Sequence, residues 1–279
     1  MGEREELRRL YLTQQMELGG AEVVLGPAAA RQGGKAAGEE AVERPGGKAA
    51  GVARLEIVAS GAGASSPKWR EHAPAIPGPG LTVITDLPAI LGDALNDAPR
   101  LDAVTELIAA CRKCTLCEGR SRTVPGEGSP EARLMLVGEG PGATEDATGR
   151  PFVGQAGQLL DKILEAIECP RPTTFIANIV KCRPPQNRKP LPDEMAACLP
   201  YLHRQIALVR PKVLIALGST AAEGMLGVRK SLGELRNKVH RWNGIPLVVT
   251  YHPAALLRNP NWKKPTWDDV RIARQLLDS

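Results

Sequence analysis

The cysteines of this 279-residue chain include a set with the spacing of metal ligands. The set consists of a C-x2-C-x2-C run and a later pair, namely Cys111, Cys114, Cys117, Cys182 and Cys198. Four thiolates arranged as two pairs suit either a tetrahedral zinc ion or an iron–sulfur cluster, and spacing does not separate the two. Reduced cysteines without a ligand are the alternative, which we expect for Cys117 and for the isolated Cys169.

A glycine-rich loop follows an apolar stretch in the segment LMLVGEGPGATEDATGRPFVG. Glycines such as Gly140 let a ligand approach backbone N–H groups closely, but the lysine of a phosphate-binding Walker loop is absent. The acidic side chains of Glu139 and Glu145 favour a polar pocket over a phosphate cradle. Phe152, in a loop between Gly and Pro residues, has a ring that can stack on a base. A plain strand-to-helix turn with Phe152 as a hydrophobic anchor is the alternative.

Two further loops carry side chains suited to a nucleic acid. Asn178 stands at the end of an apolar run and offers one donor and one acceptor, which can pair with a base edge. Basic residues that could contact phosphate follow it: Lys181, Arg183, Arg188 and Lys189. A capping Asn and a solvated charged run are the alternative interpretation.

The segment VVTYHPAALLRNP places His252 directly after another apolar run, on a turn that Pro253 restricts. Leu256 and Leu257 form an apolar tip that is followed by the cation of Arg258. A leucine wedge fills the gap that a base leaves in the stack, so this tip is a candidate DNA contact. A structural histidine and an apolar anchor at the start of a helix are the alternatives.

Alternating apolar runs and helical patterns place these loops at strand ends. Strands are predicted at residues 133–137, 174–180, 212–217 and 245–250. Helices are predicted at residues 155–168, 192–208, 220–226 and 267–277. Strand–helix alternation implies a parallel sheet covered on both faces, with its site at the carboxyl ends of the strands. The fold class is therefore α/β, with three layers.

The first 94 residues differ in composition from the rest of the chain. They include the low-complexity segment AAARQGGKAAGEEAVERPGGKAAG, which predicts a largely disordered N-terminal extension with a short helix at residues 3–17. Helical spacing in DAVTELIAAC marks the beginning of a folded domain, which we expect at residues 95–279.

Charge and hydropathy narrow the class of protein. The net charge of +5 allows a polyanionic partner without requiring one. No apolar run is long enough to cross a bilayer, and the charged start MGEREELRRLYLTQQ lacks the apolar core of a signal peptide. We expect a cytoplasmic protein that contacts no membrane. In that reducing compartment six cysteines favour metal or redox chemistry over disulfides.

Four segments resemble the signature motifs of family-4 uracil-DNA glycosylases, the iron–sulfur, thermostable type. They are GEGPGATED, GRPFVGQAGQLL, NIVKCRPPQNR and HPAALLRNP, and they occur in the family's order within residues 100–278. The resemblance implies a central four-stranded, mainly parallel sheet. It also implies hydrolysis of the N-glycosidic bond of uracil in DNA, which leaves an abasic site in base excision repair. The expected substrate is double- or single-stranded DNA, bound by a monomer associated with the nucleoid.

The resemblance also assigns roles to individual residues. The family's [4Fe–4S] ligands fall on Cys111, Cys114, Cys182 and Cys198. The catalytic positions fall on Glu139, Gly140 and His252, and the uracil pocket falls on Glu145, Phe152 and Asn178. In this scheme Phe152 stacks on the flipped uracil, Asn178 reads N3–H and O4, and His252 donates to O2. Glu145 or its neighbours would supply the steric wall that excludes the thymine methyl group.

The chain departs from related families in informative ways. Family-1 enzymes carry an aspartate in the first motif where this chain has Gly140, so the resemblance identifies no water-activating base. CRPPQNRKPLPDE lacks the reactive histidine of the cross-linking family-X enzymes, so no covalent trapping is expected. Family-5 enzymes share the cluster but have different first and last motifs. The alternatives are a catalytically idle DNA-binding or polymerase-associated module and a zinc-stabilised nucleotide-binding protein.

Overall fold

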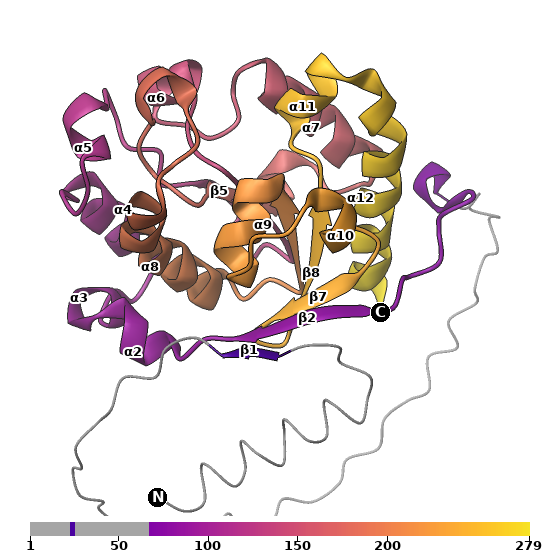
Figure 1. Cartoon of the computed structure of the whole chain (residues 1–279), viewed down its shortest axis with the longest axis horizontal. Helices are drawn as coiled ribbons and strands as arrows, with labels where there is room; N and C mark the ends of the chain where they lie inside the picture. The colour runs from indigo at the N-terminus through magenta and orange to yellow at the C-terminus, as the bar shows by residue number, and fades with distance from the viewer. Residues whose placement is uncertain (1–22, 26–66) are drawn as a thin grey trace, which may run out of the picture.

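A computed structural model describes residues 23–25 and 67–279 of the chain. Within this range, strands pair in the order β1-β2-β7-β8-β6-β4-β5-β3 in a single sheet between helices (Figure 1). The strands are β1 Val23–Leu25, β2 Pro79–Ile84, β3 Glu127–Gly128, β4 Leu134–Gly138, β5 Thr174–Asn178, β6 Val213–Leu217, β7 Val239–Trp242 and β8 Ile245–Thr250. The predicted helix at residues 3–17 and most of the predicted disordered extension lie outside the described residues.

Helices of very different length connect these strands. The α-helices are α2 Leu87–Leu91, α3 Asp93–Asn96, α4 Leu101–Ala109, α5 Leu116–Gly119, α6 Ala143–Thr148, α7 Gln155–Ala166, α8 Pro192–Val209, α9 Ser219–Leu226, α10 Leu232–Leu235, α11 Pro253–Arg258 and α12 Lys263–Asp278. Short 3-10 turns are η1 Lys68–Arg70, η2 Arg171–Thr173, η3 Pro185–Asn187 and η4 Pro260–Trp262. The described helices include none long and apolar enough to span a membrane.

The four predicted strands form the parallel centre of the sheet, in the order β8-β6-β4-β5. Successive side chains of a strand point to opposite faces, and here both faces are covered by helices. In β4, for example, Leu134 and Leu136 join the core on the side of α7 and α12, whereas Met135 and Val137 join the core on the side of α8 and α9. This arrangement confirms the three-layer α/β/α fold.

The sheet is wider than the expected four strands. Strand β7 pairs antiparallel with β8 through a tight turn in which Asn243 and Gly244 have φ angles of 44° and 83°. An Asn-Gly pair is a strong hairpin signal because both residues tolerate positive φ. Strand β2 then pairs parallel with β7, and the short β3 pairs antiparallel with β5 at the other edge. Mixed pairing therefore surrounds the parallel centre.

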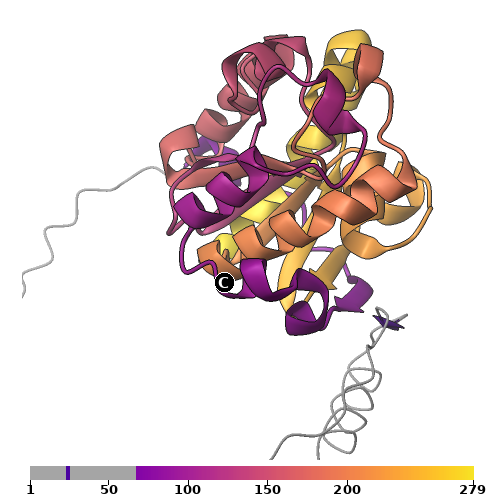
Figure 2. The same cartoon turned by 90° about the vertical axis from the view of Figure 1, so that its left-hand side faces the viewer.

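The folded part of the chain also begins earlier than the expected residue 95. Trp69 is 1% exposed, and Leu81 and Val83 of β2 belong to the core. Helices α2 and α3 lie against α8, as Figure 2 shows for the purple and orange segments. The sequence does not reveal β2 because the elements that it contacts, such as β7 and α9, come much later in the chain.

Candidate active site

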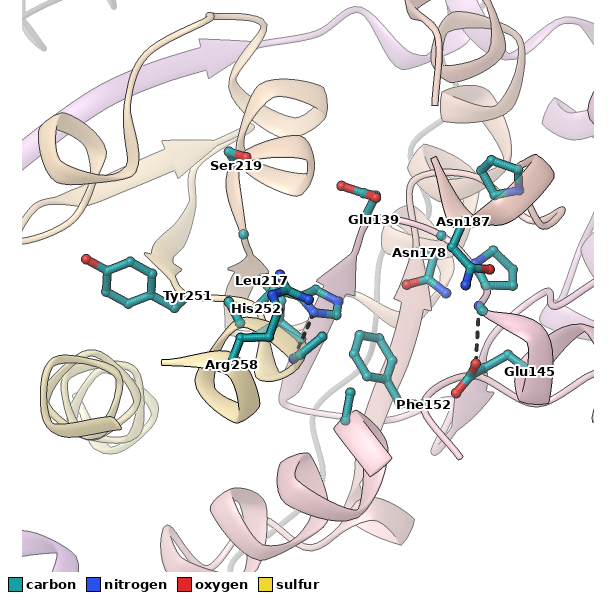
Figure 3. Close-up of a pocket in the computed structure, with 18 of the residues that line it drawn as sticks. Glu139, Glu145, Phe152, Asn178, Asn187, Leu217, Ser219, Tyr251, His252 and Arg258 are labelled. Carbon is teal, nitrogen blue, oxygen red and sulfur yellow. Dashed lines mark hydrogen bonds between the residues drawn. The ribbon is translucent and has the colours of Figure 1, made fainter. Parts of the chain in front are cut away.

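A cavity of about 500 Å³ lies where β4, β5, β6 and β8 end (Figure 3). Parallel neighbours bring their carboxyl ends to one edge of the sheet, so loops distant in sequence meet there. The structure places these predicted site residues in the wall of the cavity: Glu139, Gly140, Glu145, Phe152, Asn178, Arg188, His252 and Arg258. The two predicted wedge leucines do not line it.

Asn178 ends β5, directly opposite Gly138 of β4. Its side chain is 1% exposed, and its Oδ1 atom has no hydrogen-bond partner among the described residues. A Cβ atom on Gly138 would lie 2.4 Å from Asn178 Oδ1 and 2.5 Å from Cζ of Phe152, so any side chain at this position would displace both. A buried, unsatisfied oxygen costs about 1–3 kcal/mol, which a donor on a bound ligand can offset.

Phe152 is held in a strained backbone conformation, with φ at 51°. Arg171 stabilises it, because its Nη2 donates to the Phe152 carbonyl at 2.5 Å while its Nε donates to Asp161 at 2.8 Å. The Phe152 carbonyl would lie 1.8 Å from a Cβ atom on Gly157, which explains the third glycine of the motif GRPFVGQAGQLL. Sequence reasoning missed Arg171, since no local pattern connects it to Phe152.

Glu145 connects the two glycine-rich loops. Its Oε2 atom accepts from the backbone N–H of Gly142 at 3.2 Å, as the dashed line in Figure 3 marks. Its Oε1 atom accepts from the N–H groups of Val153 and Gly154 at 3.0 and 2.9 Å. Both carboxylate oxygens are thus engaged with backbone, so the geometry fits a residue that positions the Phe152 loop. The predicted contact with the thymine methyl group stays a prediction.

His252 caps the N-terminus of α11. Its Nδ1 atom accepts a hydrogen bond from the N–H of Ala254 at 3.2 Å, so in the neutral ring Nε2 carries the proton. Burial, and to a lesser degree the charge of Arg258, lowers the pKa of His252 to about 4. Its ring centroid lies 5.4 Å from that of Phe152. The site therefore contains a neutral N–H donor beside the aromatic ring.

Glu139 and Gly140 follow β4 at the same edge of the sheet. Thr220 of α9 donates from its hydroxyl to Glu139 Oε2 at 2.5 Å, which fixes the carboxylate against the β6–α9 turn. A Cβ atom on Gly140 would lie 2.7 Å from Cγ2 of Val180, so even alanine would be crowded there. Sequence reasoning missed Thr220, although its place at the start of a predicted helix, just after a strand end, could have indicated it.

Two arginines that the sequence offers as DNA contacts, Arg188 and Arg258, differ in their surroundings. Arg188 forms a bidentate ion pair with Glu194, with N–O distances of 2.6 and 2.8 Å. That pairing occupies donors that a phosphate would otherwise use. Arg258 at the end of α11 is exposed and lines the cavity.

The two leucines of α11 also differ, and one prediction is wrong. Leu256 is 1% exposed, so it is a packing residue and is not available to enter a DNA stack. Leu257 is 47% exposed and remains a candidate wedge. Successive residues on a helix point in directions about 100° apart, and for this reason adjacent leucines cannot share one role.

The cysteines of the first run and the later pair surround one small cavity, between α4, α5 and α8. Its lining includes Cys111, Cys114, Cys117, Cys182 and Cys198. Arg120 Nη1 donates to the sulfur of Cys182 at 3.1 Å, and the backbone N–H of Lys181 donates to that of Cys198 at 3.3 Å. Donors aimed at sulfur suit thiolates that hold a metal centre. The described residues include no group of three Cys, His, Asp or Glu side chains arranged to hold a single metal ion.

The two remaining cysteines occupy different places. Cys117 lines the same small cavity as the four predicted ligands, so a fifth thiol is present beside them. Cys169 is buried on the opposite face of the sheet, in the core formed by α7 and α12. Cys169 is thus a buried thiol away from the other five cysteines.

Comparisons with known proteins agree with this geometry. The family model for the uracil DNA glycosylase superfamily matches residues 125–273. A type-4 uracil-DNA glycosylase of Saccharolobus solfataricus is 44% identical over 188 residues, which cover 64% of this chain and 87% of that protein. The type-4 enzyme of Thermotoga maritima is 44% identical over 181 residues, covering 63% and 94%.

A type-5 uracil-DNA glycosylase of Thermus thermophilus is less similar, at 35% identity over 175 residues that cover 55% of this chain and 80% of that enzyme. The type-4 similarity extends over a longer segment and at higher identity. The chain therefore belongs to the uracil DNA glycosylase superfamily and groups with its type-4 members.

Proposed function

We infer that this protein is a uracil-DNA glycosylase, which hydrolyses the N-glycosidic bond of uracil in DNA and leaves an abasic site for base excision repair. One observation carries this most directly. The unpartnered Oδ1 of buried Asn178 lies beside the Phe152 ring and the neutral donor of His252 in one pocket. The type-4 relatives, which bear the name of this activity, support the same reaction.

Recognition of the base combines stacking with edge reading. The Phe152 ring stacks on the flipped uracil, while Asn178 accepts from N3–H and donates to O4. Cytosine presents an acceptor at N3 and an amine at C4, so both pairings would fail. A buried polar site rejects such a mismatch strongly, because its own polar groups would be left without partners.

Bond cleavage places negative charge on uracil and positive charge on the sugar. His252 donates from Nε2 to uracil O2 as charge develops there, and a fixed donor of this kind typically contributes a rate factor of about 10²–10³. Glu139, which Thr220 holds, supplies a carboxylate that stabilises the positive sugar. Water then attacks the sugar. Gly140 follows Glu139 where Val180 leaves no space for a side chain, so the backbone there keeps a close approach to the bound nucleotide.

The four cysteines fit a [4Fe–4S] cluster held by Cys111, Cys114, Cys182 and Cys198. Its role when bound is structural, because glycosidic hydrolysis transfers no electrons. Cys182 lies four residues after Asn178 in the loop that follows β5, so fixing this sulfur also fixes the loop next to the uracil reader.

DNA binding completes the proposal. Exposed Leu257 enters the stack where the uracil has left, and Arg258 contacts a neighbouring phosphate. Arg188 contacts DNA only where a phosphate competes with Glu194 for its guanidinium. We place the protein in the cytoplasm with the nucleoid, because its substrate is there, and we expect it to act as a monomer.

The decisive experiment incubates the purified protein with single strands and with duplexes that contain U:G or U:A. Alkali-labile breaks at the uracil are expected in at least one substrate. Asn178→Ala should lose about 100-fold in kcat/KM, as expected when paired hydrogen bonds worth ~3 kcal/mol disappear from a buried site. No cleavage of any substrate would contradict the proposal and favour the idle DNA-binding module.

The cluster has its own test. The purified protein should contain about four irons per chain and absorb near 400 nm. Cys182→Ser should abolish that absorption, whereas Cys169→Ser, on the opposite face, should leave it unchanged. Zinc in place of iron would overturn the cluster assignment while leaving the proposed reaction intact.

A further inference from the structure

The cavity extends well beyond the residues assigned to uracil. Its volume of about 500 Å³ lies within the range of pockets that hold drug-sized ligands, whereas uracil is a single six-membered ring. Phe152 and Asn178 occupy one side of the pocket, and Tyr251 lies on the other side of His252 (Figure 3). Trp262 and Leu232 also line the cavity. The second half of the pocket thus contains two aromatic rings and a leucine, none of which is assigned to uracil.

An aromatic shelf, formed by Tyr251 and Trp262, lines this second half. The two rings are stacked, with centroids 4.8 Å apart and planes inclined by only 4°. Each ring is intermediate in exposure. A partly exposed indole at the wall of a pocket is a stacking surface for a flat ligand, and every nucleobase has a π-face that can stack on it.

The shelf is rigidly supported from behind. The Arg236 guanidinium lies over the Tyr251 ring, 4.6 Å from its centroid. Arg236 is held in turn by a buried ion pair with Asp269, at 2.7 and 3.1 Å, and Thr250 donates to the same carboxylate at 2.6 Å. Ion pairs of this kind, once buried, fix geometry because breaking them leaves an uncompensated charge. The shelf is therefore pre-organised before any ligand binds.

We propose that the aromatic shelf binds a second nucleobase, the one next to the flipped uridine in the same DNA strand. This inference rests on the proposed uracil excision. The neighbouring nucleotide is joined to the uridine by a single phosphate. Arg258 lies between the Phe152 side and the shelf in Figure 3, where it can contact that phosphate. The neighbouring base then leaves the helical stack and rests on Trp262.

A fluorescent base tests this contact directly. 2-Aminopurine is placed on the 5′ side of the uridine, on its 3′ side or opposite it, in strands whose uridine carries a 2′-fluoro group that resists cleavage. We expect the emission to change on binding for one same-strand neighbour, and we expect Trp262→Leu to abolish that change. Trp267→Leu is the matched control, because Trp267 packs against the α7–α12 core and does not line the cavity.

Kinetics supply the second test. Replacing the neighbouring nucleotide by an abasic spacer should lower kcat/KM for uracil about ten-fold in the wild-type protein, the effect of losing one base–aromatic stack. In Trp262→Leu the spacer should make no difference, and Trp262→Phe, which keeps a ring, should retain most of the effect. An equal spacer penalty in wild type and Trp262→Leu would overturn the shelf proposal.

The two proposals fail in distinguishable ways. Absence of uracil excision by the wild-type protein contradicts the proposed function itself. Excision that is normal in the wild type, with a 2-aminopurine signal that persists in Trp262→Leu, contradicts only the second base site. A signal confined to the base opposite the uridine would also overturn the same-strand assignment.

Discussion

The imidazole of His252 is arranged to donate a hydrogen bond without carrying a charge. Because its pKa is lowered to about 4, the neutral form persists far below the ordinary titration range of histidine. Excision rates should therefore stay constant between pH 7 and pH 5 and fall only near pH 4. At that pH a proton on Nδ1 displaces the N–H of Ala254 and adds charge beside Arg258.

Single-turnover rates across this pH range give the measurement. His252→Ala should lower the rate by about 10²–10³ at neutral pH, and the fall in rate near pH 4 should be absent from its pH profile. A wild-type profile with a midpoint near 6.5 that is absent from His252→Ala would show that the ring titrates normally, contrary to its burial.

Gly138 has no side chain, yet it determines whether Asn178 is in place to bind uracil. In Gly138→Ala the new methyl group would collide with both Asn178 Oδ1 and the Phe152 ring. We expect a loss of about 100-fold or more in kcat/KM, because displacement of positioning groups by even an ångström is costly. Gly78→Ala is the control, since a Cβ atom there meets nothing within 4 Å. Equal activity of both variants would contradict this geometry.

At the scale of elements, helix α6 and the Phe152 loop depend on one carboxylate. Glu145→Ala removes the acceptor of three backbone N–H groups, so uracil excision should fall by about ten-fold or more. Glu145→Gln keeps one acceptor oxygen and should lose less.

The same two variants test whether Glu145 positions the Phe152 loop or excludes the thymine methyl group. Thymine excision measured beside uracil excision is the readout. If Glu145 acted as the wall against the thymine methyl group, Glu145→Ala would gain activity on thymine. The structure predicts that Glu145→Ala lowers uracil excision and gains no activity on thymine.

The central elements could be predicted from sequence because their signals are local. Strand β8 and helix α8 were predicted to within a residue at each end. Both have a clear local signal, an apolar run in the strand and helical spacing of apolar residues in the helix. Strand β2 was missed because its partner β7 lies about 160 residues later, and pairing across that separation leaves no local pattern. The Asn243–Gly244 hairpin, in contrast, had a readable signal that the strand analysis did not use.

The candidate site divides in the same way. Asn178 and His252 stand at strand ends, so their convergence follows from topology alone. Trp262 lines the pocket and Arg171 holds the Phe152 carbonyl, and both placements come from tertiary packing that leaves no local sequence pattern. Leu256 and Leu257 could not be separated before the phase of α11 was known.

At the scale of the whole molecule, residues 67–94 belong to the fold. A chain that starts at residue 95 lacks β2, Trp69 and helix α2, which packs on α8, and it leaves β7 as an exposed edge. We expect it to unfold at a temperature well below that of the full chain, or to aggregate. Thermal unfolding followed by circular dichroism compares the two chains. A truncated chain with an unchanged midpoint would show that the domain begins at residue 95 after all.

The dependence of stability on pH involves His203 of α8, which packs against Trp242 with ring centroids 5.1 Å apart. Neither ring nitrogen has a partner among the described residues, and burial, together with the charge of Lys181, lowers the pKa of His203 to about 4. The unfolded chain takes up this proton near pH 6.5, but the folded protein does not. The associated stability is thus complete above pH 6.5 and is lost as the pH falls toward 4.

Replacing His203 by Phe keeps a ring and removes both the titration and the two unsatisfied nitrogens. At pH 5, protonation of His203 in the unfolded chain lowers the free energy of unfolding by ~2 kcal/mol. This corresponds to roughly 4–8 °C in the unfolding midpoint of a domain this size. We expect His203→Phe to raise the midpoint by about that much more at pH 5 than at pH 8, with His203→Leu as a smaller replacement in case the phenyl ring is crowded. The same shift at both pH values would mean that His203 takes up its proton in the folded protein.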